Sequence, residues 1–64
     1  MKIENGIIKE NNTFVGTAKK SFKYGYHPAV KVEIENGTVR WFELDEQDLV
    51  NKIISWVQRE DHKS

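Results

Sequence analysis

Asn36-Gly37 restricts the fold of this chain more than any other feature, because it lies between two stretches in which apolar and polar residues alternate. Asn-Gly in such a context is the strongest short-range signal for a β-hairpin, since a two-residue type I′ turn needs positive φ at both central positions. The sequence therefore predicts a tight hairpin centred on these two residues. The cross-strand pairs it implies are Glu35–Thr38, Ile34–Val39, Glu33–Arg40, Val32–Trp41 and Lys31–Phe42.

This register sorts the side chains of the hairpin onto two faces, because successive residues of a strand point to opposite sides. One face is charged and carries Lys31 and Arg40, and it is expected to point away from the core. Phe42 falls on the charged face and is its one large apolar residue. The residues expected on the core face are Val30, Val32, Ile34, Val39 and Trp41.

The tetrapeptide Ile-Glu-Asn-Gly occurs a second time, at residues 3–6. Asn11-Asn12 follows closely and is itself a turn signal, so two turns would leave a strand of only four residues between them. The favoured interpretation is one strand over residues 2–10, bulged near Gly6, because glycine inside a strand often marks a bulge. A hairpin within residues 2–10 is the alternative that the sequence leaves open.

Two further segments complete the expected architecture. Residues 13–23 are rich in Thr, Val and Phe and predict a strand, and residues 49–57 repeat apolar side chains at helical spacing, with Asp45 as the expected N-cap and Asp48 in the first turn. The fold class is therefore α+β: an antiparallel meander of three to four strands with one C-terminal helix packed on one face. Residues 1–60 are expected to form this single domain, and residues 61–64 a frayed tail.

The composition restricts how such a domain is stabilised and where it works. The 64 residues contain no cysteine, which excludes disulfides and thiolate metal sites and leaves a good core or a homodimer as the means of stabilisation. The chain shows no targeting segment and no apolar run of membrane-spanning length, so no membrane partner is expected. A cytoplasmic location is the expectation.

The sequence lacks the residue patterns of an active site. Ser21 and His27 form a conceivable dyad, but no third group stands at a recognisable spacing. The acidic residues of 43–48 are explained by helix capping, and no histidine spacing typical of a metal site is present. We therefore expect a non-enzymatic protein with no catalytic residues, no metal, no cofactor and no small-molecule substrate.

One stretch does suggest a binding function. Residues 18–31 hold four lysines and three aromatic residues, and no acidic residue occurs from Thr13 to Val32. Basic groups contact phosphates and aromatic rings stack on bases, so this interleaving is typical of a nucleic-acid surface. The expected site combines the outer sheet face with the loop at 24–28. Its candidate residues are Lys19, Lys20, Lys23, Tyr24, Tyr26, Lys31 and Arg40.

Two other interpretations fit the same residues. Strand lysines also protect a sheet edge from pairing with other chains, so the stretch is consistent with an ordinary solvated face. The net charge of zero favours instead a protein-binding module, such as a homodimer or a small accessory or inhibitor protein of a phage or mobile element. That module would use Phe42 as a partner contact, together with the two tyrosines and an exposed strand edge.

Overall fold

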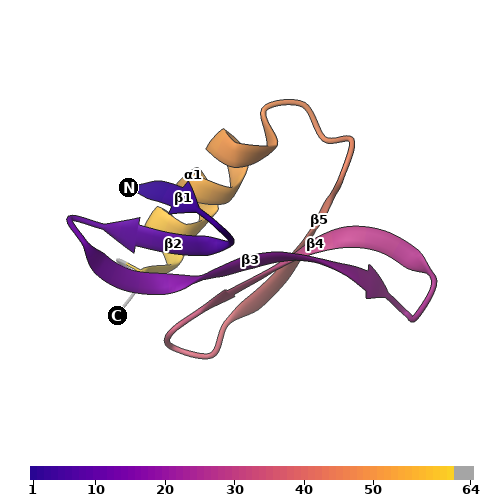
Figure 1. Cartoon of the computed structure of the whole chain (residues 1–64), viewed down its shortest axis with the longest axis horizontal. Helices are drawn as coiled ribbons and strands as arrows, with labels where there is room; N and C mark the ends of the chain where they lie inside the picture. The colour runs from indigo at the N-terminus through magenta and orange to yellow at the C-terminus, as the bar shows by residue number, and fades with distance from the viewer. Residues whose placement is uncertain (62–64) are drawn as a thin grey trace.

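The computed structural model describes residues 1–61 and shows five strands followed by one helix (Figure 1). The strands form a single antiparallel sheet in chain order, and the helix packs on one of its faces. The α+β class and the C-terminal helix are confirmed, but the sheet has five strands rather than three or four. The elements are β1 (Lys2–Glu4), β2 (Ile7–Glu10), β3 (Thr13–Lys23), β4 (His27–Ile34), β5 (Val39–Glu43) and α1 (Leu49–Asp61).

The extra strand arises because residues 2–10 form a hairpin and not one bulged strand. Asn5 and Gly6 have φ of 53° and 77°, as a type I′ turn requires, and Glu4 pairs directly with Ile7 across it. The turn at Asn11-Asn12 forms as expected, with both φ values positive. The alternative with two turns is therefore the correct one, and β2 is the four-residue strand between them.

The hairpin of β4 and β5 forms, but its predicted register is wrong by one residue. Val32 pairs with Arg40 rather than Trp41, because the loop contains three residues instead of two. Ile34 N–H donates to the Thr38 carbonyl, and of the three loop residues only Gly37 has a positive φ, of 94°. This is a type I turn closed by a left-handed glycine, the usual three-residue hairpin loop.

A one-residue change of register moves every side chain of a strand to the opposite face. Phe42, expected on the outer face, instead pairs with Val30 and is 4 % exposed in the core. Arg40 moves with it to the helix side, while Trp41 and Val39, expected in the core, face outward. The expected pair of Glu33 with Arg40 is not formed, because Glu33 lies opposite Val39.

The helix begins at Leu49, later than the sequence predicts, and Asp45 is not its N-cap. Asp48 has a φ of 54°, which is incompatible with a helical turn, and its carbonyl accepts the first helical bond from Lys52 N–H. The core residues of the helix are Ile53, Trp56 and Val57. Asp61 is its last residue, and the rest of the expected frayed tail, 62–64, lies outside the described residues.

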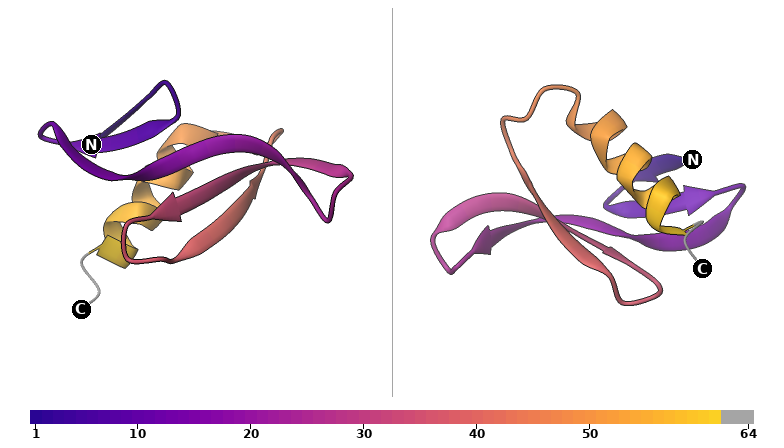
Figure 2. Two further views of the ribbon diagram at one scale, coloured as in Figure 1. Left: turned by 60° about the horizontal axis from the view of Figure 1, so that its bottom comes forward. Right: turned by 180° about the vertical axis from the view of Figure 1, so that it is seen from behind.

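The helix covers only one end of the sheet. The helix contacts β4 and β5, with Trp56 against Phe42, whereas Figures 1 and 2 show the far end of the β3–β4 hairpin extending away from α1 along the molecule. Strand β2 pairs with β3 only as far as Thr17, so the following part of β3 has β4 as its single neighbour. We call residues 19–31 the distal hairpin. This arrangement leaves the tip of the distal hairpin projecting from the core.

Candidate functional site

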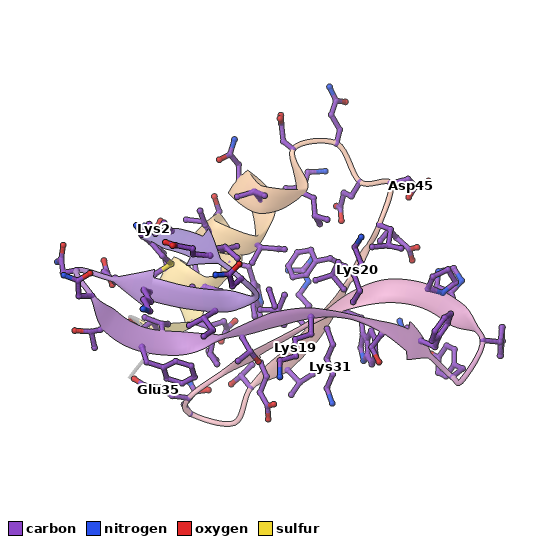
Figure 3. All side chains as sticks on the ribbon, in the orientation of Figure 1. Lys2, Lys19, Lys20, Lys31, Glu35 and Asp45 are labelled. Atoms are coloured by element: carbon purple, nitrogen blue, oxygen red, sulfur yellow. The ribbon has the colours of Figure 1, made fainter. Side chains whose placement is uncertain are left out.

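The outer face of the distal hairpin brings two lysines directly opposite one another. Lys19 on β3 and Lys31 on β4 are cross-strand partners, and Figure 3 shows them side by side below the sheet, with Lys20 on the other side. Like charges in such positions destabilise a sheet, because the two Cβ atoms are only about 5 Å apart. Among residues 1–61, neither Lys19 nor Lys31 takes part in an ion pair. The pair therefore presents uncompensated positive charge to solvent.

Protection of a sheet edge explains only part of this charge. Lys19, Lys20 and Lys23 lie on the section of β3 that has no second neighbouring strand, where lysines discourage further pairing. Lys31 is different, because β4 is flanked by β3 on one side and β5 on the other. A lysine on a central strand does not protect an edge, because both sides of that strand are already paired. Edge protection therefore does not account for Lys31.

Trp41 on β5 places an aromatic ring next to the Lys19–Lys31 pair. It pairs with Lys31, and the Lys31 ammonium lies 6.0 Å from the centroid of its indole ring. A cation at this distance from the ring face is held by the ring quadrupole. The outer face therefore carries a row of Lys19, Lys31 and Trp41 across β3, β4 and β5.

The tip of the distal hairpin carries three exposed aromatic rings. Phe22, Tyr24 and Tyr26 are 63 %, 77 % and 76 % exposed, respectively. The rings of the two tyrosines have centroids 6.4 Å apart, and the Lys23 ammonium lies 5.3 Å from the Tyr24 centroid. The expected loop at 24–28 is shorter than predicted, because His27 and Pro28 already belong to β4. The structure therefore groups Lys23, Tyr24 and Tyr26 as the sequence predicted.

Arg40 and Phe42 do not belong to this group. The Arg40 guanidinium lies on the helix side, 4.7 Å from the Phe42 ring centroid and 5.9 Å from that of Trp56. It lines a hollow of about 390 Å³ between β5 and α1, together with residues of both charges that include Glu46 and Arg59. Phe42 packs edge-on against Trp56 with centroids 6.0 Å apart. Its near-complete burial leaves almost no surface for the predicted partner contact.

The carboxylates near the distal hairpin are partly engaged with other side chains. Glu43, opposite Ala29 on the outer face, accepts a hydrogen bond of 2.8 Å between its Oε2 and His27 Nε2. Glu33 lies two residues from Lys31 on the outer face of β4, so it is the outer-face carboxylate closest to Lys31 in sequence.

At the other end of the sheet, Lys2 hydrogen-bonds the exposed Glu4 carboxylate and lowers its pKa below the ordinary value, mainly through that bond and then through its charge.

The structure offers little support for other chemistry within residues 1–61. His27 contacts Glu43, but no hydrogen bond joins Ser21 to His27 in this part of the chain. The same residues contain no cluster of three metal-ligating side chains. The helix they form, α1, is not long and apolar enough to cross a membrane. Comparison with known proteins finds no family model, no curated protein and no solved structure that matches the chain.

Two aromatic residues with solvent-accessible rings, the half-buried Trp41 and the exposed Phe22, were not among the predicted site residues. Trp41 was expected in the core, and only the three-residue loop at 35–37 turns it outward. Phe22 is exposed because it lies near the tip opposite Pro28, where no element of the described chain covers it. The acid-free composition was the only sequence signal that could have included Phe22. No local signal marked Trp41, since its face depends on the turn.

Proposed function

We propose that this chain is a small, non-enzymatic module that binds nucleic acid through the distal hairpin. The observation that carries the proposal is the Lys19–Lys31 pair, two unneutralised charges held opposite each other on the outer face. Phosphate oxygens bound between the two ammonium groups would convert their repulsion into attraction. Lys20 and Lys23 add positive charge along the same hairpin, and a cytoplasmic location, where nucleic acid is present, forms part of the proposal.

Binding fits the hairpin better than catalysis does. Nucleophilic catalysis requires a base within hydrogen-bonding reach of the nucleophile, and Ser21 lacks that contact in the structure. Arg40 is not part of the proposed surface, because it lies on β5 outside the distal hairpin and its guanidinium stacks on Phe42. The protein-binding alternative has lost its main anchor, since Phe42 is buried. A protein partner or a homodimer is therefore the explanation to pursue if nucleic acid does not bind.

The test is a fluorescence anisotropy titration of labelled DNA and RNA at several salt concentrations. If all four lysines of the hairpin neutralise phosphates, log K should fall linearly with log salt, with a slope of about −2.8 for a single strand or about −3.6 for a duplex. Replacing Lys19 and Lys31 by alanine together should reduce the magnitude of that slope by about half. Far-UV circular dichroism should confirm that the double variant is folded.

A matched control removes the same charge from another part of the molecule. Lys9 lies on β2 and Lys52 on α1, both exposed and both outside the distal hairpin. The double variant Lys9→Ala with Lys52→Ala should leave the salt slope unchanged. Equal losses in the two double variants would show that only overall charge matters, and absence of binding at low salt would overturn the proposal.

A further inference from the structure

Exposed aromatic rings at the hairpin tip call for an explanation beyond phosphate binding. Large apolar side chains scattered singly over a surface are ordinary, but a contiguous group marks an interaction site. Phe22, Tyr24 and Tyr26 lie within five residues, and each ring is more than 60 % exposed. Within residues 1–61 no other chain segment packs over this tip (Figure 2). The rings are thus available to a ligand.

The backbone at Tyr24 shows that the tyrosine is not there to form the turn. Tyr24 has a φ of 59° and is followed by Gly25 at 81°, within the three-residue loop that connects the paired residues Lys23 and His27. Bulky residues rarely adopt positive φ, whereas asparagine tolerates it well. The two other turns of this chain with consecutive positive φ values both begin with asparagine, at Asn5 and Asn11. A tyrosine at the tip carries a conformational cost that asparagine would lower, which indicates that its ring has a function.

The two tyrosine rings are neighbours at the tip, and their centroid spacing is slightly shorter than the spacing that a base between two rings needs. Their centroids are 6.4 Å apart and their planes are inclined by 35°. Stacked bases of a strand lie about 3.4 Å apart, so a base between two rings needs a spacing of about 6.8 Å. Both side chains are exposed, so binding of a base requires them to rotate until the rings are parallel and slightly farther apart. The Lys23 ammonium, 5.3 Å from the Tyr24 centroid, supplies positive charge beside the bound nucleotide.

From these observations we infer that the ligand of the distal hairpin is a single strand, with one unpaired base held between Tyr24 and Tyr26 and its phosphates on the lysines. This inference rests on the proposed function and names the form of nucleic acid. In a duplex the base faces are occupied by neighbouring bases, so rings on a protein surface stack on unpaired bases. Lysines on both sides of the hairpin, such as Lys19 and Lys20, suit a flexible strand that contacts more than one side.

Three labelled probes of equal length separate base stacking from phosphate binding and single strands from duplexes. They are oligothymidine, an abasic strand with the same phosphates, and a duplex. The intact chain should bind oligothymidine at least about tenfold more tightly than the abasic strand, because stacking contributes to affinity only when a base is present. It should also bind oligothymidine more tightly than the duplex. Equal affinities for oligothymidine and the abasic strand would overturn the inference.

Variants of the two tyrosines test the same point on the protein side. Tyr26→Ala should weaken oligothymidine binding by about 5- to 150-fold, the range for loss of one stacking ring, and should change abasic-strand binding by less than about twofold. Tyr24→Asn should act in the same direction, with the positive φ of the turn retained. Phe14→Ala removes a half-exposed ring at the other end of β3 and should leave both affinities unchanged.

The possible results distinguish this inference from the proposed function. Loss of oligothymidine binding in both tyrosine variants, with Phe14→Ala unaffected, supports it. If both tyrosine variants bind normally, or if the duplex binds more tightly, the single-strand inference fails, while loss of binding in the Lys19/Lys31 double variant would still support the proposed function. If none of the probes binds at low salt, both fail.

Discussion

The two copies of Ile-Glu-Asn-Gly fold into different turns although their four residues are identical. In the first copy, residues 3–6, Asn5 and Gly6 both have positive φ and form a two-residue loop. In the second copy, residues 34–37, only Gly37 has a positive φ, and the loop contains three residues. Local sequence therefore restricts the choice to a few turns without selecting one of them.

Contacts outside the tetrapeptide account for the difference. The first turn is held against β3, because Ala18 N–H donates to the Gly6 carbonyl at 2.9 Å. The second turn is bonded to β3 at a different point, because Glu35 N–H donates to the Val15 carbonyl at 2.9 Å, and Asn36 Oδ1 accepts a bond of 2.8 Å from Thr38 N–H within the loop. Its three-residue loop also directs Phe42 toward Trp56. The apolar residues beyond each turn thus decide its register.

The largest expected effect separates the two possible registers of the second hairpin. Phe42→Ala should lower the free energy of unfolding by about 3–5 kcal/mol, the usual cost of removing a buried phenylalanine. Trp41→Ala should lower it by about 1 kcal/mol, because that ring is only partly buried and its contact with Lys31 is a surface interaction. Urea denaturation followed by circular dichroism measures both values.

A two-residue loop like that of the first copy would reverse this order, since Trp41 would then lie in the core. Phe42→Leu serves as the control, because a swap of similar volume should cost less than about 1.5 kcal/mol. A larger loss for Trp41→Ala than for Phe42→Ala would contradict the three-residue loop. The ratio of the two losses therefore reports the register directly.

The next effect concerns Gly16, the residue of β3 at which the two hairpins meet. Gly16 pairs with Ile8 on one side and with Ile34, the first residue of the second copy, on the other. A Cβ atom at this position would overlap the Glu33 carbonyl oxygen and approach Ile34 Cα to 2.8 Å. Gly16→Ala should therefore destabilise the domain by about 3 kcal/mol through overpacking against backbone.

The measurement for Gly16→Ala is again urea denaturation, with Ala18→Ser on the same strand and face as a substitution of similar size. If Gly16→Ala retains the unfolding free energy of the parent chain, then β3 does not approach β4 as closely as the structure shows. A loss that is much larger than that of Ala18→Ser would support the close approach.

The sequence predicted those parts of the fold that depend on local pattern. The α+β class, the C-terminal helix and the presence of a second hairpin follow from periodicity and turn residues. The register of β5 and the start of α1 do not, because they depend on which apolar residues reach the core. Asp48 illustrates this, since its positive φ moves the helix start beyond the predicted N-cap.

The candidate site was predictable to a similar extent and for the same reason. The grouping of Lys23, Tyr24 and Tyr26 is local to one turn, so composition was enough to propose it. Arg40 and Trp41 lie on the faces opposite to those predicted, because the loop at 35–37 has three residues and the prediction assumed a two-residue turn. The face on which a residue lies beyond a turn depends on the number of residues in that turn, and the pattern of the strand alone does not determine that number.

The smallest expected effect tests the two turns against each other with one substitution. Asn5→Gly should change the free energy of unfolding by less than about 0.5 kcal/mol, because glycine accepts the positive φ of that position readily. Asn36→Gly should lower it by about 1–2 kcal/mol, since the variant loses the bond to Thr38 N–H and gains backbone freedom in the unfolded chain. Denaturation of the two variants in parallel with the parent chain provides the comparison. Equal costs would mean that both copies adopt the same turn, whereas the predicted difference would show that identical residues contribute differently because their surroundings differ.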